Sequence, residues 1–367
     1  MSDPDALGLI RGFADGSLAP PPAATPRQLA MTAFLEASGW DGIVPAPLAA
    51  DASFRSYYRL RRGPDTAIVP DTAILMDAPP PHEDVGPYVA VAAMLRGLGL
   101  SAPEVMAEHR AEGFLLIEDF GDDTYTRLLA RGADDRTLYA LAVDTLTALQ
   151  QAVAEDRVAP DLPPYDPARL LGEVALFVDW YLPAVLGAPI SAAQREEYLA
   201  LWRAVLPQAT RPFAATLVLR DFHIDNLMLL PGRGGVRRCG LLDFQDAVCG
   251  PPGYDLVSLI EDARRDVPED LRREMTLRYL AAFPALDRGA FARSTAILAA
   301  QRNCKILGIF TRLWKRDGKP SYLVHVPRLW RLLDADLREP ALSGIARWLD
   351  RHLPPAARRT PDLRGRA

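Results

Sequence analysis

The most constraining feature of this sequence is a change in the spacing of its apolar residues near residue 122. Before it, short apolar and aromatic segments stand between turn residues, as in Phe54–Leu60, Ala73–Met76 and Gly113–Gly121, and this pattern favours strands. After it, apolar residues recur at helical spacing, as in Leu138, Ala142, Leu146 and Leu149. We therefore expect an α+β fold with a small strand-rich N-lobe, a larger and mainly helical C-lobe, and a ligand cleft between them.

This division predicts four segments along the chain. Residues 1–26 are rich in proline and small residues and are interpreted as a loose leader. Residues 27–118 are expected to form the N-lobe, beginning with a helix over Arg27–Ser38 and binding a nucleotide. Residues 119–353 are expected to form the C-lobe, and residues 354–367 a flexible tail made basic by its arginines.

Composition excludes several classes of protein. The formal net charge is −5, which argues against a broad nucleic-acid-binding face. Three cysteines without paired spacing predict neither disulfides nor a zinc site, and no apolar stretch is long enough to span a membrane. Without a signal peptide at its start, the chain is expected to be cytoplasmic. Lysine is rare, and all three lysines lie at or after Lys305.

Three polar residues in the C-lobe form the pattern that carries chemistry. Two apolar segments, 216–219 and 227–230, are predicted to form a hairpin around a polar loop that contains Asp221 and Asn226. Asp243 ends the next predicted strand, so the three side chains can converge on the cleft. Their oxygens suit Mg²⁺, and such a set suits phosphoryl transfer. Taken singly, Asp221 and Asn226 are equally consistent with ordinary turn residues.

These residues resemble a known superfamily. The loop Leu219–Asn226 and Asp243–Phe244 are similar to the H-G-D-x-x-x-x-N and D-F/W motifs of the aminoglycoside phosphotransferase and choline kinase-like superfamily, although here the first motif reads Leu219-Arg220-Asp221. The resemblance implies a bilobal, protein-kinase-like fold and ATP as phosphoryl donor with Mg²⁺. It implies that Asp221 is the catalytic base and that Asn226 and Asp243 hold the metal. Glu118, in the segment that resembles the inter-lobe hinge, is expected to bind the nucleotide.

A closer resemblance covers roughly residues 28–352. Its motifs are specific only in combination: Asp51–Arg55, Tyr57–Arg59, Ile74–Pro80, Leu241–Ala247, Gln301–Phe310 and Asp317–Pro320. They are similar to the bacterial N-acetylmuramate/N-acetylglucosamine anomeric kinases of peptidoglycan recycling. The resemblance implies phosphorylation of the sugar's anomeric hydroxyl to the 1-phosphate. Within the same class, a kinase for an aminoglycoside or a small amino-alcohol is the alternative.

Two departures from the superfamily weaken the match in the N-lobe. The strand lysine that holds the nucleotide phosphates is replaced by Met76, and no other lysine lies in this lobe. Arg55 or Arg59 could supply the charge as a guanidinium fork, or both could be surface residues. The nucleotide loop lacks repeated glycines, so Ser53 would have to contact phosphate. Both departures also fit a nucleotide-binding scaffold without catalysis, an interpretation against which the complete set of Asp221, Asn226 and Asp243 argues.

The remaining candidates surround this site. Glu173 and Asp179 are expected to contact the acceptor sugar, although a satisfied helix surface is equally consistent with them. Arg302 is expected to meet the lactyl carboxylate of muramate, with an ion pair inside the protein as the alternative. His223 is expected to pack beneath the loop rather than to bind metal. Asp255, in the segment Gly250–Val257, is interpreted as structural and is expected to accept backbone N–H groups at a helix start.

Overall fold

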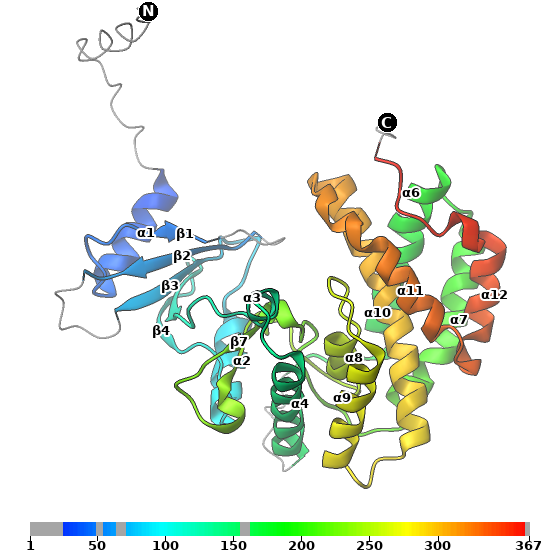
Figure 1. The fold of residues 1–367 in the computed structure, drawn as a ribbon. Helices are drawn as coiled ribbons and strands as arrows, with labels where there is room; N and C mark the ends of the chain where they lie inside the picture. Colours follow the sequence, from blue (N-terminus) through cyan, green and yellow to red (C-terminus); the bar gives the residue numbers. More distant parts are fainter. Residues whose placement is uncertain (1–24, 49–53, 64–70, 155–161, 364–367) are drawn as a thin grey trace, which may run out of the picture. The chain divides into compact units, whose positions relative to one another are not determined.

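The computed structural model describes residues 25–48, 54–63, 71–154 and 162–363 (Figure 1). The chain forms two compact units, residues 1–44 and residues 45–367. The first contains α1 (Pro26–Ala37), which begins with a capping box in which Thr25 and Gln28 bond each other's backbone N–H groups. The helix predicted at residues 27–38 is thus confirmed, but it lies in a separate unit from the sheet with which it was expected to form one lobe. Most of the predicted leader and Ser53 lie outside the described residues.

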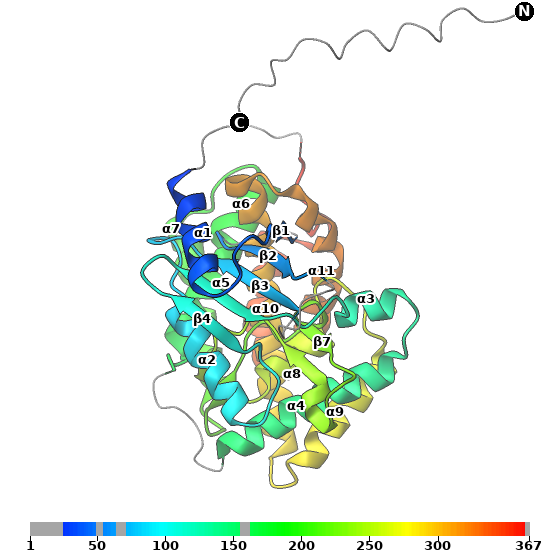
Figure 2. The same cartoon turned by 90° about the vertical axis from the view of Figure 1, so that its left-hand side faces the viewer.

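The second unit begins with a five-stranded antiparallel sheet in the order β1-β2-β3-β5-β4 (Figure 2). Its strands are β1 (Ala46–Pro47), β2 (Ser56–Arg61), β3 (Thr72–Asp77), β4 (Val105–His109) and β5 (Phe114–Glu118). In the central register Leu75 is paired with Tyr58 on one side and with Leu116 on the other. The buried face of α2 (Gly86–Gly97) shares a core with this sheet. The sheet ends at Glu118, where the sequence placed the lobe boundary.

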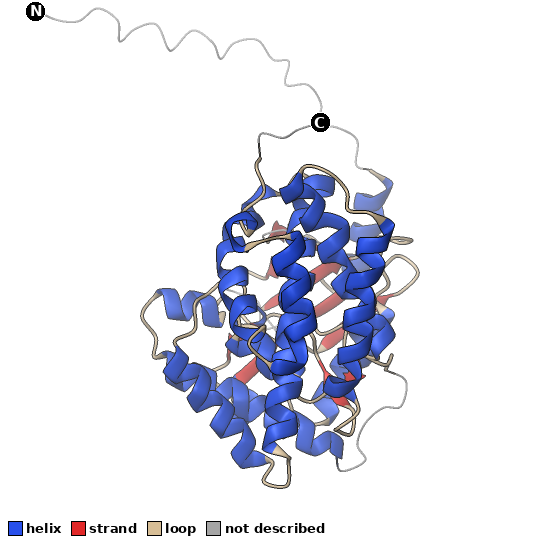
Figure 3. Ribbon diagram, turned by 90° about the vertical axis from the view of Figure 1, so that its right-hand side faces the viewer, coloured by secondary structure: helices blue, strands red, loops and turns tan. Residues whose placement is uncertain are grey.

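Helices dominate the rest of the unit (Figure 3). They are α3 (Tyr125–Ala130), α4 (Asp135–Ala152), α5 (Pro167–Leu176), the π-helix η3 (Phe177–Tyr181), α6 (Leu182–Leu186), α7 (Ala192–Thr210), α8 (Tyr254–Ile260), α9 (Glu269–Ala282), α10 (Arg288–Asp317), α11 (Val326–Asp336) and α12 (Ser343–His352). Short 3₁₀ turns are η4 (Ile224–Asn226), η5 (Gly235–Arg238), η6 (Pro320–His325), η7 (Pro340–Leu342) and η8 (Pro355–Ala357). The apolar stripe predicted on α4 is fully buried. Long α10 packs on α5, α7, α8 and α11 and forms the centre of the helical core.

The prediction that segments 216–219 and 227–230 pair with each other as a hairpin is wrong. β6 (Thr216–Val218) pairs with β9 (Val248–Gly250), and β7 (Leu227–Leu229) pairs with β8 (Cys239–Leu241). Each strand therefore finds its partner downstream, and residues 219–226 connect two separate ribbons instead of closing a turn. The physical reason is that apolar alternation identifies a strand but does not select its partner.

The start of the segment expected to be a flexible tail is packed. Arg358 forms ion pairs with Asp334 and Asp350, and its side chain is buried over the Trp330 ring. The Arg359 carbonyl accepts a hydrogen bond from the Tyr181 hydroxyl at 2.7 Å. Within the described ranges, no helix combines the length and the apolarity needed to cross a membrane.

Candidate active site

The loop Leu219–Asn226 is held from below by one buried carboxylate. Asp255 has no exposed surface and accepts hydrogen bonds from the backbone N–H groups of Leu219 at 2.7 Å and Arg220 at 2.9 Å. Asp255 thus binds backbone N–H groups of this loop and not, as the sequence suggested, those at the start of its own helix α8. Burial raises the pKa of Asp255 to about 7, and the two N–H groups act in the opposite direction.

The three residues singled out from the sequence come together. The Asn226 amide nitrogen donates to the Asp221 carbonyl at 3.0 Å and to Asp243 Oδ2 at 3.3 Å. Gln245 donates to Asp243 Oδ1 at 2.7 Å. Among the described residues no side chain donates a hydrogen bond to the half-buried Asp221 carboxylate, which leaves it available to a ligand.

Two residues of this site have left-handed backbone conformations that favour glycine. Arg220 has φ of 71° and Asp243 has φ of 57°, and in the part of the chain that the structure describes they are the only non-glycine residues with positive φ. Such conformations persist where the surroundings over-determine them, and they cluster at functional sites. The residue before Asp221 and the residue that faces Asn226 are therefore both held in defined directions.

The donor set fits a magnesium ion. Because the Asn226 amide nitrogen is committed to two hydrogen bonds, its Oδ1 faces away from them, and no described residue donates to it. This amide oxygen and the Asp243 carboxylate are hard oxygen ligands, and Mg²⁺ takes few protein ligands while retaining water. Across residues 25–48, 54–63, 71–154 and 162–363 no group of three or more His, Cys, Asp or Glu side chains could hold a metal ion, so the fit rests on these two residues.

His223 is a buried, neutral residue. Only 6% of its surface is exposed, and its Nε2 lies 3.5 Å from the Asn226 amide nitrogen and 3.4 Å from Arg264. Burial and the neighbouring Arg264 and Arg302 lower the pKa of His223 to about 3. It therefore lies beneath the loop, where the sequence placed it.

Arg55 lies beside Asp243 at the candidate site. Its Nε donates to Glu83 at 2.9 Å, and its Nη1 lies 3.9 Å from Asp243 Oδ1. Met76, at the position aligned with that lysine, is 1% exposed and belongs to the apolar core. An arginine on the approach to β2 thus brings a paired guanidinium to the site that β3 leaves without a charge.

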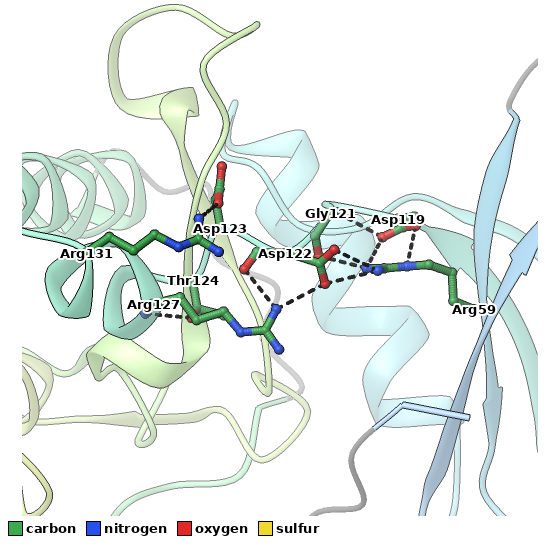
Figure 4. Close-up of polar contacts among 8 residues, drawn as sticks. All are labelled: Arg59, Asp119, Gly121, Asp122, Asp123, Thr124, Arg127 and Arg131. Atoms are coloured by element: carbon green, nitrogen blue, oxygen red, sulfur yellow. Dashed lines mark hydrogen bonds and ion pairs between the residues drawn. The ribbon is translucent and has the colours of Figure 1, made fainter. Parts of the chain in front are cut away.

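Arg59 has a different environment from the one expected for a phosphate ligand (Figure 4). Its guanidinium donates to Asp122 at 2.9 and 3.0 Å, to Asp119 at 2.9 Å and to the Gly121 carbonyl at 2.8 Å. The side chain is 9% exposed. The hinge segment, residues 119–122, places two carboxylates and a carbonyl around this one arginine. Arg59 therefore ties β2 to the hinge segment, and both of its terminal nitrogens are hydrogen-bonded to that segment.

Glu118 also faces protein partners. Its carboxylate pairs with Arg233 and lies 3.7 Å from Arg96. Both arginines, with Arg237 and Glu104, line a cavity of about 320 Å³ beside the hinge segment. The side chain is thus directed into this cavity, and contact of the hinge with a nucleotide would involve backbone atoms.

The three acceptor candidates do not share one environment. Asp179, on η3, forms a two-pronged ion pair with Arg195 at 2.7 and 3.0 Å. Arg302 is 4% exposed and donates to the Glu261 carbonyl at 3.1 Å. Only Glu173 contacts the 219–226 loop, through Arg220 at 2.5 Å. Glu173 also accepts a hydrogen bond from Lys305 at 3.0 Å. The sequence did not predict this contact, although Lys305 lies in the motif Gln301–Phe310 and is the first lysine of the chain.

Comparison with known proteins identifies the family. Residues 44–292 match the phosphotransferase enzyme family. The chain belongs to this family. This phosphotransferase is 38% identical over 359 residues to the N-acetylmuramate/N-acetylglucosamine kinase of Caulobacter vibrioides, and the match covers 91% of this chain and 98% of that protein. It is also 38% identical over 328 residues to the enzyme of the same name from Pseudomonas aeruginosa, covering 85% and 90%.

Solved structures show the same fold. The GDP complex of wild-type aminoglycoside 2'-phosphotransferase-IIIa has a TM-score of 0.55 at 15% identity and covers 84% of this phosphotransferase and 97% of that chain. Choline kinase from Cryptosporidium parvum has a TM-score of 0.55 at 12% identity, covering 88% and 99%. The predicted α+β, protein-kinase-like fold is confirmed, and the phosphotransferase is an enzyme that acts as a kinase.

Proposed function

We propose that this phosphotransferase transfers the γ-phosphoryl group of ATP to the anomeric hydroxyl of N-acetylmuramate or N-acetylglucosamine. The observation that carries the proposal is 38% identity to a kinase named for these sugars, over 91% of the chain. The hydrogen-bonded set of Asp221, Asn226 and Asp243 supports it, because a chain that bound nucleotide without catalysis would not need all three. ATP as donor implies a cytoplasmic reaction.

Asp221 is the proposed base. Its carboxylate would accept the proton of the sugar O1–H as O1 forms a bond to the γ-phosphorus, while the bond from that phosphorus to the bridging oxygen breaks and ADP leaves with the electron pair. The anomeric hydroxyl is more acidic than an ordinary alcohol, so a carboxylate is an adequate base. Because the transition state of phosphoryl transfer is loose, positioning and charge neutralisation contribute most of the catalysis.

Asn226 and Asp243 are the residues that would hold Mg²⁺. When bound, the ion would supply positive charge to the nucleotide phosphates. Arg55, 3.9 Å from Asp243 and oriented by Glu83, would add a guanidinium on the same side. Arg55 would thus supply the positive charge that is missing at Met76, where the superfamily has a lysine. Ser53 remains a proposed phosphate contact.

The test is ADP release from Mg·ATP with a panel of acceptors. The panel contains N-acetylmuramate, N-acetylglucosamine, their 1-O-methyl glycosides, kanamycin and choline. We expect turnover of the free sugars and none of the blocked glycosides, because only the former present an anomeric hydroxyl. Turnover of kanamycin or choline alone would reject the sugar assignment and leave the kinase intact.

Asp221→Asn separates chemistry from binding. This variant keeps the shape of the side chain and loses the base, so we expect turnover of the preferred sugar to fall at least about 100-fold while ATP affinity stays within about threefold. Asp243→Asn is the matched variant at the proposed metal ligand, and it should weaken Mg·ATP binding instead. Near-full activity of Asp221→Asn would refute the assignment of the base.

A further inference from the structure

Arg220 occupies an unusual position in the site. It precedes the proposed base directly, and its φ of 71° is one that arginine rarely adopts. Its backbone is held at both ends, since its N–H donates to Asp255 at 2.9 Å and its carbonyl accepts from the Ser258 hydroxyl at 3.3 Å. The peptide that leads into Asp221 is therefore fixed by contacts that Arg220 makes.

The Arg220 side chain is anchored as firmly as its backbone. The guanidinium donates to Glu173 Oε1 at 2.5 Å and lies 5.6 Å from the centre of the Tyr165 ring. The side chain is 14% exposed, and its other carboxylate neighbour, the exposed Asp246, is 4.0 Å away. Glu173, from α5, is thus the main anionic partner of the residue next to the base.

Glu173 is the centre of a larger network. Besides Arg220 it accepts hydrogen bonds from Lys305 at 3.0 Å, from Tyr165 at 2.5 Å and from Gln301 at 3.2 Å. Burial acts to raise the pKa of Glu173, but Lys305 and Arg220 outweigh it and lower this pKa overall. The carboxylate therefore stays ionised inside the protein, where a single charge would otherwise be unfavourable.

Lys305 connects this network back to the loop. It is the only one of the three lysines that is buried, and its Nζ lies 3.5 Å from the Tyr254 hydroxyl. Tyr254 is adjacent in sequence to Asp255, which binds the backbone of Arg220. The contacts thus form a closed circuit through α5, α10, α8 and the loop. Such a circuit resists displacement of the loop more than separate contacts would.

We propose that Glu173, clamped between Lys305 and Arg220, is a positioning residue that sets the direction of Asp221 through Arg220. This inference rests on the proposed role of Asp221 as base. It replaces the contact with the acceptor sugar that the sequence suggested for Glu173, whose two oxygens are already occupied by four protein donors. No contact of Glu173 with the sugar is required.

The first experiment is Glu173→Gln, which keeps the size of the side chain and removes its charge. Because a misplacement of about 1 Å costs about 100-fold in rate, we expect kcat to fall about 10- to 100-fold, with KM for ATP and for the acceptor within about threefold. Asp144→Asn is the control, since it breaks a two-pronged arginine pair with Arg278 between α4 and α9 and touches nothing in the circuit. Its kcat should match the wild type.

A double variant distinguishes a role of Glu173 in positioning Asp221 from a role in protein stability alone. Glu173→Gln leaves Lys305 without its anionic partner and leaves Arg220 with only the exposed Asp246 at 4.0 Å, so its melting temperature should fall. Adding Lys305→Met removes the unpaired buried cation, and we expect it to recover stability but not kcat, because Arg220 still lacks its main anionic partner. Recovery of kcat together with stability, or a kcat of Glu173→Gln within threefold of wild type, would overturn the proposal.

The acceptor in these assays is the member of the panel that the wild-type enzyme phosphorylates fastest. If the wild type phosphorylates none of them, the hydrolysis of ATP by water is measured instead. A failure of the sugar assignment would appear in the wild type, whereas a failure of the positioning role would appear only in the variants.

Discussion

At the scale of one residue, Arg55 is the proposed source of the positive charge that Met76 cannot supply. The lysine position on β3 is Met76, buried in the core, and a guanidinium paired with Glu83 lies beside Asp243 instead. Arginine suits the task because its fork can bond a carboxylate and a phosphate at once.

Replacing Arg55 tests whether its charge contributes to nucleotide binding. Charge-assisted hydrogen bonds contribute about 1.5–3 kcal/mol, so Arg55→Met should weaken Mg·ATP binding about 10- to 100-fold. Arg55→Lys should recover part of that loss, because the charge returns without the fork. Titration of the nucleotide against each variant gives the dissociation constants. Arg61→Met, at the exposed end of β2, is the control and should bind as the wild type does; equal affinities of all four proteins would reject the role of Arg55.

At the scale of elements, α10 joins the core to the site. It runs from Arg288 to Asp317, with most of its central turns buried, and it carries both Gln301 and Lys305 to Glu173. Its close approach to the end of α5 depends on Gly308. A Cβ built on this glycine would lie 2.4 Å from the backbone carbonyl carbon and oxygen of Leu176. The two helices could not keep this separation with a larger residue.

Gly308→Ala is therefore expected to destabilise the protein. The added methyl group must push α10 away from Leu176, and overpacking of this kind typically costs about 1–3 kcal/mol. Gly172→Ala is the matched control, because Gly172 lies in α5 and nothing approaches its Cβ position within 4 Å. That variant should gain about 0.5–1 kcal/mol from helix propensity. Urea unfolding measures both, and equal stabilities would contradict the packing argument.

At the scale of the molecule, Arg59 connects the sheet to the segment that leads into the helices. Its guanidinium joins β2 to the hinge segment through Asp119, whose side chain is 5% exposed, and Asp122, which also binds Arg127 (Figure 4). The link between Arg59 and Asp119 spans 60 residues of sequence. The sheet that would hold the nucleotide and the start of the helical region are thus coupled by one buried cation.

Breaking this link should be costly. Arg59→Met leaves the Asp119 carboxylate buried without its partner, and removing one member of a buried pair typically costs about 3–5 kcal/mol. Arg127→Met removes the other arginine of Asp122, but its side chain is 56% exposed, so a loss below about 1 kcal/mol is expected. Thermal and urea unfolding of the two variants provide the comparison. A similar small loss in both would show that the hinge does not depend on Arg59.

Local pattern was sufficient to predict many of the helices and strands. The spacing of Leu138, Ala142, Leu146 and Leu149 predicted a buried helix face because helical geometry is repetitive and short-range. The five-residue interval between Asp221 and Asn226 predicted that their polar groups could meet. In the structure the Asn226 amide bonds the Asp221 backbone carbonyl and the Asp243 carboxylate, whereas the roles of the three side chains stay a prediction. These features depend on neighbours along the chain, which a sequence displays directly.

Only the tertiary structure decided which residues far apart in the sequence pair with each other. Glu173 meets Lys305 across 132 positions, Arg59 meets Asp119 across 60, and β6 and β7 pair with downstream strands instead of each other. An arginine or glutamate in a sequence gives no sign of its partner, because ion pairs form wherever folding brings opposite charges out of water together. The amino-acid sequence by itself thus determined the elements and the proposed catalytic loop, whereas packing assigned the charged residues around that loop to their partners.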